Sequence, residues 1–77
     1  MARTIILDWT NTLVLLSSNE HRDVKYQVYR DSDKHFLEMR AANDEPIHTL
    51  ELPEGMKLDR TSYEVLLRYV LLDVVAA

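Results

Sequence analysis

Histidine is the residue type in this chain whose chemistry is easiest to test from spacing. A zinc site needs three or four ligands that converge on one point, and the three histidines lie apart in the sequence, at His21, His35 and His48. In the strand register set out below, His35 and His48 are not cross-strand neighbours, and His21 lies in a polar stretch. We therefore expect no metal site. We expect His48, beside Met39, to be buried or half-buried with a local hydrogen bond, where it could make stability or association pH-dependent.

Other side chains that could support catalysis or cofactor binding are sparse or unpaired. The serines and threonines have no histidine and acid partners that the sequence can place beside them. The chain has no cysteine, which excludes thiolate sites and disulfides and is typical of a reducing compartment. Phosphate-cradling loops need several glycines, and Gly55 is the one glycine present. We expect no catalytic residue, no cofactor and no enzymatic activity.

One short motif points to a specific chemistry. Residues Ile5-Ile6-Leu7-Asp8-Trp9-Thr10-Asn11-Thr12-Leu13 place a carboxylate after an apolar run, with hydroxyls two and four residues later. This stretch resembles the nucleophile motif of the haloacid-dehalogenase superfamily, which includes the P-type ATPases. The resemblance implies that Asp8 accepts a phosphoryl group and that Thr10 and Thr12 orient phosphate, within a larger parallel sheet that also supplies a lysine and an acidic pair for magnesium. The alternative interpretation is a purely structural role, in which Asp8 ends a buried strand and Thr10 and Thr12 form a turn. We favour this structural interpretation. Phosphoryl transfer by Asp8 is kept as an alternative.

The element that the rest of the chain must accommodate is a helix over about 61–76. Thr61 and Glu64 form a capping-box pattern, and Asp59 with Ser62 offers a second cap two residues earlier, so the helix begins between 59 and 62. Glu64 and Arg68 are spaced to pair on its surface.

This helix has two apolar arcs at about 100° per residue, whereas an ordinary surface helix has one. The broad arc consists of Tyr63, Leu66, Leu67, Val70, Leu71 and Val74, and the narrow arc of Val65, Tyr69, Leu72 and Ala76. We expect the broad arc to pack on a sheet. We expect the narrow arc to pack in a homodimer, because isologous pairing is the commonest way to cover such a stripe.

Residues 24–52 predict a three-stranded antiparallel meander: VKYQVYR, HFLEMRAA and PIHTLEL alternate with turn formers at 31–34 and 43–45. Turns closed at their centres set a register that gathers the apolar side chains on one face, and a slip of one residue would scatter them. The rows of this face are Val28-Leu37-Leu50, Tyr26-Met39-His48 and Val24-Ala41-Pro46. The rows of the opposite, mostly polar face are Tyr29-Phe36-Glu51, Gln27-Glu38-Thr49 and Lys25-Arg40-Ile47.

The opposite face carries one aromatic cross-strand pair, Tyr29 with Phe36, on the side predicted to face water. Such a pair stabilises a hairpin. The functional interpretation makes it a contact anchor, since aromatic residues are enriched at binding hot spots.

The N-terminal region contains two apolar runs within residues 4–16. We predict two strands, 3–9 and 12–17, joined by a tight turn. A single long strand, or a strand followed by a short helix capped at Thr10, remains open. Both faces are apolar, which suits an interior strand or one covered at an interface. Residues 17–23 predict a polar, mobile loop.

The charge balance argues against nucleic acid. A net charge of −4 supplies no basic face to neutralise phosphates. One alternative is kept: a dimer could assemble a basic surface from Arg3, Arg22, Lys25, Arg30 and Arg40.

Taken together, these patterns predict one α+β domain spanning 1–77. It would have an antiparallel sheet of four to five strands, including the 24–52 meander, with the helix packed on one face. The N-terminus lacks the features of a signal peptide, and no stretch approaches the roughly 20 apolar residues of a membrane span, so we expect a cytoplasmic protein without membrane contact. We expect it to bind a larger protein as an inhibitor, adaptor or regulatory subunit, as phage or mobile-element inhibitors of host machinery do. The expected partner-binding residues are Tyr29, Phe36, Val65, Tyr69 and Leu72.

Overall fold

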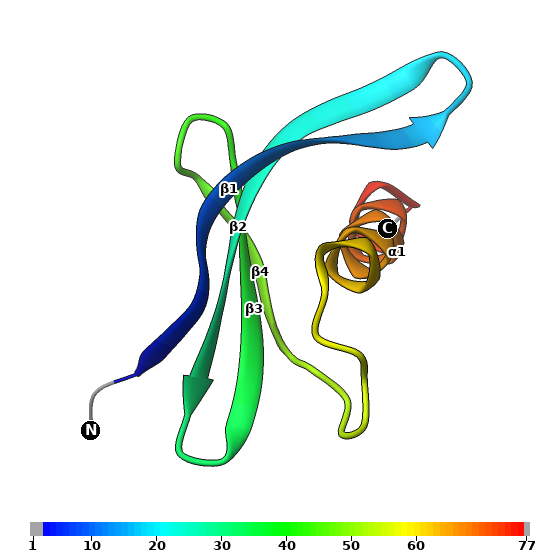
Figure 1. The fold of residues 1–77 in the computed structure, drawn as a ribbon. Coiled ribbons are helices and arrows are strands. Elements are labelled where there is room, and N and C mark those ends of the chain that lie inside the picture. Colours follow the sequence, from blue (N-terminus) through cyan, green and yellow to red (C-terminus); the bar gives the residue numbers. More distant parts are fainter. Residues whose placement is uncertain (1–2, 77) are drawn as a thin grey trace.

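Four antiparallel strands and a C-terminal helix make up the fold in the computed structural model, which describes residues 3–76 and the side chains of residues 3–73 (Figure 1). The elements are β1 (Thr4–Ser17), β2 (Glu20–Asp31), β3 (Lys34–Ala41), β4 (Pro46–Glu51) and α1 (Arg60–Ala76). Each strand pairs with its neighbour in the chain, giving the sheet order β1-β2-β3-β4. The predicted α+β class, with an antiparallel meander and a C-terminal helix, is confirmed.

The register of the meander follows from its turns. The turns after β2 and β3 contain residues with positive φ, Ser32 at 60° and Asp44 at 74°. Aspartate tolerates this conformation because its short polar side chain can hydrogen-bond to nearby backbone. Closing the chain at these points places Val28 opposite Leu37 and Leu37 opposite Leu50, as predicted. The other predicted rows also form, apart from those at the start of β4.

At the start of β4 the predicted register is wrong by one residue. An irregularity between Met39 and Arg40 leaves Arg40 opposite Pro46, where the turn-based register placed Ile47. Such a bulge changes which face the following side chains occupy. Ile47 therefore packs against the core and not on the polar face, a change that removes an apolar side chain from water.

His48 was also misplaced by the prediction. It lies opposite Met39 as expected, yet its side chain is exposed. The reason is its position on β4, the edge of the sheet, where a single helix cannot cover all four strands. His48 is neither buried nor half-buried.

β1 is one 14-residue strand and contains no turn, so the prediction of two strands is wrong and the single long strand is correct. The residues of the expected turn, Thr10 and Asn11, instead pair with Tyr26 and Lys25 of β2. The register of β1 shifts before them, between Ile5 and Leu7 and between Leu7 and Thr10, and again after them, between Leu15 and Ser17. The predicted polar loop at 17–23 is also wrong, because β2 already begins at Glu20 and the turn between β1 and β2 is formed by Ser18 and Asn19 alone.

α1 begins after Asp59, the second of the two predicted caps. The Ser62 amide donates to Asp59 Oδ1 at 2.8 Å. This hydrogen bond satisfies one of the amides that a helix leaves unpaired at its start. It also holds the pKa of Asp59 below its ordinary value.

The core lies between the sheet and the broad arc of α1. Tyr63, Leu67 and Leu71 are buried, and Leu66 and Val70 pack at the margin of the core. The side chain of Val74 lies outside the described part of the chain. Tyr26 of β2 meets Tyr63 edge to face, with ring centroids 6.2 Å apart. The broad arc therefore packs as predicted.

The β1–β2 hairpin continues beyond β3 as a two-stranded arm that reaches toward α1 (Figure 1). Val14 and Leu16 on one face of this arm are buried in the same cluster as the helix residues. Leu13 and Leu15 alternate with them and point to the other face, where they stay exposed.

Candidate interaction surfaces

The aromatic pair on the outer face of the sheet forms as predicted but is not open to water. Tyr29 and Phe36 stack with centroids 5.5 Å apart and an angle of 24° between the rings. The Arg3 guanidinium lies 4.0 Å above the Tyr29 ring. Tyr29 is consequently only 7% exposed, and Phe36 is half-buried. The expectation that this side faces water is wrong for Tyr29, because the Arg3 guanidinium lies over its ring.

A second aromatic group on the same face is Trp9. The bulge in β1 sets Asp8 and Trp9 together against Gln27 of β2. The Arg40 guanidinium lies 4.9 Å from the Trp9 ring centroid, and the Lys25 ammonium lies 5.9 Å from it. Cations over aromatic faces attract the ring quadrupole, so charged side chains and aromatic rings together form a compact outer layer.

The basic residues of this layer are largely neutralised within the chain. Arg40 pairs with Glu38 at 2.8 Å, and Arg3 approaches the same carboxylate at 4.0 Å. Lys25 forms an ion pair with Asp44, and hydrogen bonding from its ammonium holds the pKa of the Asp44 carboxyl below its usual range. Three of the five cations proposed for a nucleic-acid surface therefore already face carboxylates.

The Asp8 carboxylate is hydrogen-bonded within the β1 bulge. Its Oδ1 accepts hydrogen bonds from Gln27 Nε2 at 3.0 Å and from the Trp9 amide at 2.8 Å. Thr10 Oγ1 donates to the Asp8 carbonyl at 2.8 Å. The carboxylate thus fixes the bulge in an antiparallel edge strand. The parallel sheet implied by the resemblance to haloacid dehalogenases is not the arrangement of the described strands.

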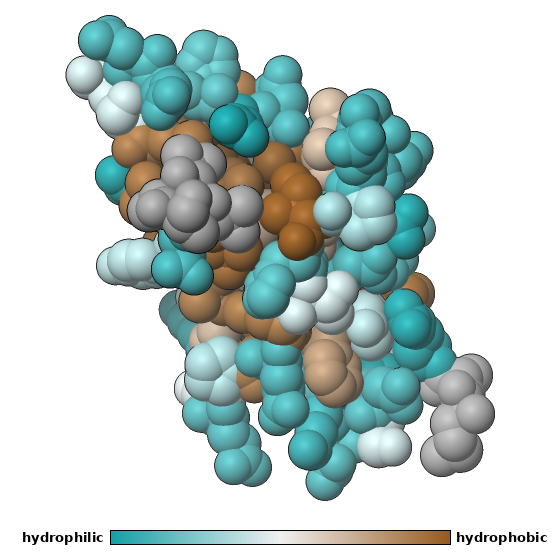
Figure 2. All heavy atoms as spheres, turned by 180° about the vertical axis from the view of Figure 1, so that it is seen from behind, coloured by the Kyte–Doolittle hydropathy of each residue, from teal (hydrophilic) through white to brown (hydrophobic). Residues whose placement is uncertain are grey.

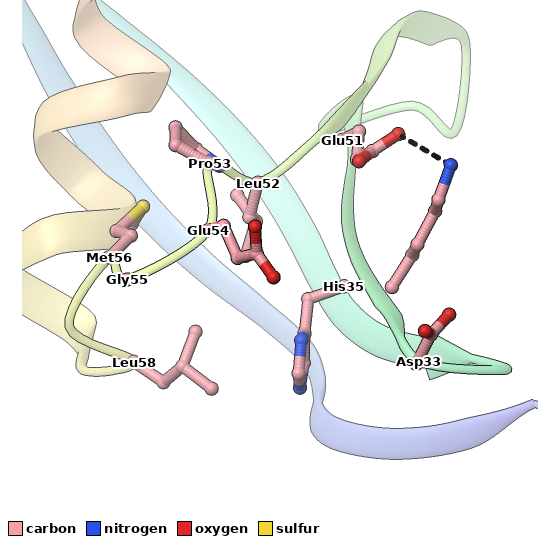
Figure 3. Close-up of a pocket in the computed structure, with 10 residues that line it drawn as sticks. Asp33, His35, Glu51, Leu52, Pro53, Glu54, Gly55, Met56 and Leu58 are labelled. Atoms are coloured by element: carbon pink, nitrogen blue, oxygen red, sulfur yellow. Dashed lines mark ion pairs between the residues drawn. The ribbon is translucent and has the colours of Figure 1, made fainter.

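A groove of about 350 Å³ lies between the β2–β3 turn and the segment that leads into α1 (Figure 3). His35, Glu51 and Glu54 line it, with the Lys34–Glu51 ion pair at 3.9 Å on one side. Figure 3 shows the His35 ring turned toward Leu58 and away from Glu51. No group of three or more histidine and acidic side chains within residues 3–73 is arranged to hold a metal. The groove therefore offers no ligand set or nucleophile with a base beside it.

The largest set of exposed apolar side chains lies on β1. They are Ile5 (44%), Ile6 (42%), Trp9 (37%), Leu13 (52%) and Leu15 (59%). β1 is an edge of the sheet, so one side of its backbone has no partner strand. A hollow of about 430 Å³, lined in part by Leu13, Asp23 and Ala42, adjoins the regular part of this strand. The sequence shows the two apolar faces of this segment, whereas its place at the edge follows from the order of the strands in the sheet.

The narrow arc of α1 is the second exposed apolar set. Val65 is 49%, Tyr69 67% and Leu72 37% exposed. The side chain of Ala76 lies outside the described part of the chain. Figure 2 shows hydrophobic surface gathered around the C-terminal part of α1 and the adjoining hairpin arm. Val65, Tyr69 and Leu72 are thus left uncovered by the other residues that the structure describes, while their role in a dimer stays a prediction.

Comparison of the chain with protein-family models, with curated proteins and with solved structures found no match. In the described residues, no helix has the length and apolar character needed to cross a membrane.

Proposed function

We propose that this chain is a non-enzymatic protein-binding domain, in which a strand of a larger protein pairs with the free edge of β1. The observation that carries this proposal is the concentration of exposed apolar side chains on one unpaired strand. Because the chain lacks cysteine, we place this activity in a reducing compartment, the cytoplasm.

The two edges of the sheet differ in how they are protected. Proteins commonly blunt edge strands with short length, proline, charge or bulges, because free N–H and C=O groups template pairing with other chains. β4 is six residues long and begins with Pro46. β1 is 14 residues long and carries a single charged side chain, Asp8. The less protected edge is therefore β1, in the part that its bulges do not distort.

Within β1, the segment that suits an added strand is Thr10–Leu15. The bulges between Ile5 and Thr10 distort the first half, whereas residues 10–15 pair with β2 without interruption. In strand addition the backbone hydrogen bonds give affinity, and alternate side chains give specificity. Leu13 and Leu15 would provide the apolar contacts. A domain that caps a partner's strand in this way suits an inhibitor, an adaptor or a regulatory subunit.

The test uses the purified full chain as bait in an extract of the native host. Leu13→Lys/Leu15→Lys places two charges on the exposed face of β1 and should weaken capture of a stoichiometric protein partner at least tenfold. The matched control, His48→Lys/Thr49→Lys, adds two lysines at exposed positions of β4 and should leave capture unchanged.

Reconstitution with the purified partner then locates the contact. Amide hydrogen exchange within residues 10–15 should slow when the partner binds, because these backbone groups become paired. Equal capture by the two double variants, or unchanged exchange in β1, would contradict the proposal.

Two other functions have less support. A nucleic-acid regulator would need Arg3, Lys25 and Arg40 to exchange their carboxylate contacts for phosphates, and its binding would weaken steeply with salt. Phosphoryl transfer would need Asp8 released from the hydrogen bonds that hold the β1 bulge.

A further inference from the structure

The exposed arc of α1 has the spacing of a coiled-coil seam. Val65, Tyr69 and Leu72 follow one another at steps of four and three residues, which is the a/d pattern of a heptad. The opposite side of the helix, formed by Tyr63, Leu67 and Leu71, is buried against the sheet. α1 therefore presents a second seam on the side that faces away from the sheet (Figure 1).

Two opposite charges flank this seam. With Val65 and Leu72 at d and Tyr69 at a, Arg68 occupies g and Asp73 occupies e. Both side chains are exposed, and neither forms an ion pair with another residue in the described part of the chain. Charges at e and g are the ones that select the partner and its orientation in coiled coils.

The sequence separation of these charges selects one orientation. In a parallel two-helix pair, a g side chain faces the e' side chain five residues further along the partner, and Asp73 follows Arg68 by five residues. Each pair of chains would therefore form two Arg68–Asp73 ion pairs related by the two-fold axis. In an antiparallel pair, g faces g' and e faces e', so Arg68 and Asp73 would not meet.

We propose that a second copy of this chain covers the arc, with the two α1 helices parallel and Arg68 of each protomer paired with Asp73 of its partner. This surface is separate from the β1 edge, so the inference does not rest on the function proposed above. The seam from Val65 to Leu72 spans only about one heptad. It therefore supplies only a small part of the roughly 800 Å² that a standard interface buries on each side. The dimer is therefore expected to be weak, with a Kd on the order of micromolar.

Sedimentation equilibrium over a concentration series tests the ion pairs. The mass of the full chain should rise from 9.0 kDa toward twice that value with concentration. Arg68→Glu and Asp73→Lys should each weaken association at least tenfold, and the double variant Arg68→Glu/Asp73→Lys should restore it. Arg22→Glu makes the same charge change as Arg68→Glu at an exposed position in the hairpin arm and should leave association unchanged.

A cysteine cross-link tests the orientation, since the natural chain has no cysteine. In the parallel dimer Val65→Cys lies beside its own copy and should form an intermolecular disulfide. In an antiparallel pair centred between Tyr69 and Leu72 the two cysteines would be about 16 Å apart along the axis, beyond disulfide reach. Thr49→Cys, exposed on β4, is the control for random collision.

Each outcome decides the proposal. A mass of 9.0 kDa at all concentrations together with cross-linking no faster than in Thr49→Cys overturns it. A dimer that ignores Arg68→Glu but dissociates with Leu13→Lys/Leu15→Lys also overturns it, because pairing would then use β1. If a charge variant fails to fold by circular dichroism, the Val65→Cys result still decides.

Discussion

Tyr26 and Tyr63 are two buried tyrosines in contact, yet their hydroxyls differ. The Tyr26 hydroxyl lies 3.3 Å from Glu64 Oε2 and donates to it. The Tyr63 hydroxyl is buried without a hydrogen-bond partner. A satisfied hydrogen bond to a charged group contributes to stability, whereas an unsatisfied buried hydroxyl costs its desolvation.

This contrast predicts opposite effects for the same substitution. Tyr26→Phe should lower the free energy of unfolding by about 1 kcal/mol, because it removes a hydrogen bond to a carboxylate. Tyr63→Phe should leave the free energy unchanged or raise it by up to about 1 kcal/mol, because it removes a hydroxyl that has no partner. Urea denaturation of the two variants beside the natural chain measures both, and equal losses would show that Tyr63 has a partner after all.

At the scale of elements, Asp59 decides where α1 begins. The sequence allows two N-caps for this helix, Asp59 and Thr61. In the structure Asp59 is the cap, because its carboxylate accepts a hydrogen bond from the Ser62 amide. A carboxylate at this position also complements the partial positive charge of the helix N-terminus. Asp59 should therefore stabilise α1 in its ionised form.

The pKa of Asp59 gives this cap a pH dependence. Its folded pKa lies below the ordinary value of 3.8, chiefly because the carboxylate accepts from the Ser62 amide. The stabilisation is therefore complete above pH 3.8 and is lost as the pH falls through the folded pKa. Asp59→Ala should lower the melting temperature at pH 7, and its difference from the natural chain should shrink in strong acid. Asp59→Asn keeps a hydrogen-bond acceptor without a charge. Its melting temperature at pH 7 should lie between those of Asp59→Ala and the natural chain. A difference independent of pH would contradict the capping role of the charge.

In β1 the position of the strand in the sheet decides which of its apolar side chains are buried and which stay exposed. Two apolar faces suggested an interior strand or one covered at an interface; β1 is an edge of the sheet whose distal half packs against α1. One face of its distal half contributes Val14 and Leu16 to the core, and the other exposes Leu13 and Leu15. Alternate side chains of this strand therefore stabilise the fold on one face and are free to contact a partner on the other.

At the scale of the whole molecule, the buried tyrosines link stability to alkaline pH. Burial raises the pKa of Tyr26 and of Tyr63 above the ordinary value of 10.0. Because the folded pKa values are raised, the contribution of the two neutral tyrosines to the free energy of unfolding is fully present below pH 10.0. This contribution is lost as the pH rises through the folded pKa values. The free energy of unfolding should therefore fall above about pH 10, and Tyr26→Phe/Tyr63→Phe should fall less steeply. The free energy of unfolding, measured by denaturation at several pH values between about 9 and 11, should show this difference. An equal dependence on pH in the natural chain and in the double variant would contradict the assignment to these tyrosines.

The two candidate interaction surfaces lie on different elements, β1 and α1. The β1 edge would bind another protein and the α1 seam a second copy, so a dimer would carry two β1 edges. Two linked sites strengthen binding to a multivalent partner without new contacts, provided that the geometry lets both engage.

The meander and the two-arc helix could be predicted from the sequence because both follow from short-range rules. Turn residues at 31–34 and 43–45 set the strand pairing, and a period of two gathers the apolar side chains on one face. A period near 3.6 separates the two arcs of the helix, and Val65, Tyr69 and Leu72 lie outside its buried side as that period requires.

Only the tertiary structure decided the path of β1, the face of Ile47, the exposure of His48 and the burial of Tyr29. Each depends on a contact between distant segments. The β1 bulge is held by Asp8 against Gln27, and Tyr29 is covered by Arg3 from the N-terminus. Bulges shift side chains between faces when the gain in burial exceeds the local cost, and no local pattern records that balance. The sequence alone therefore determined the meander, the helix and their apolar faces, and packing decided the path of β1 and which apolar faces remain free to bind.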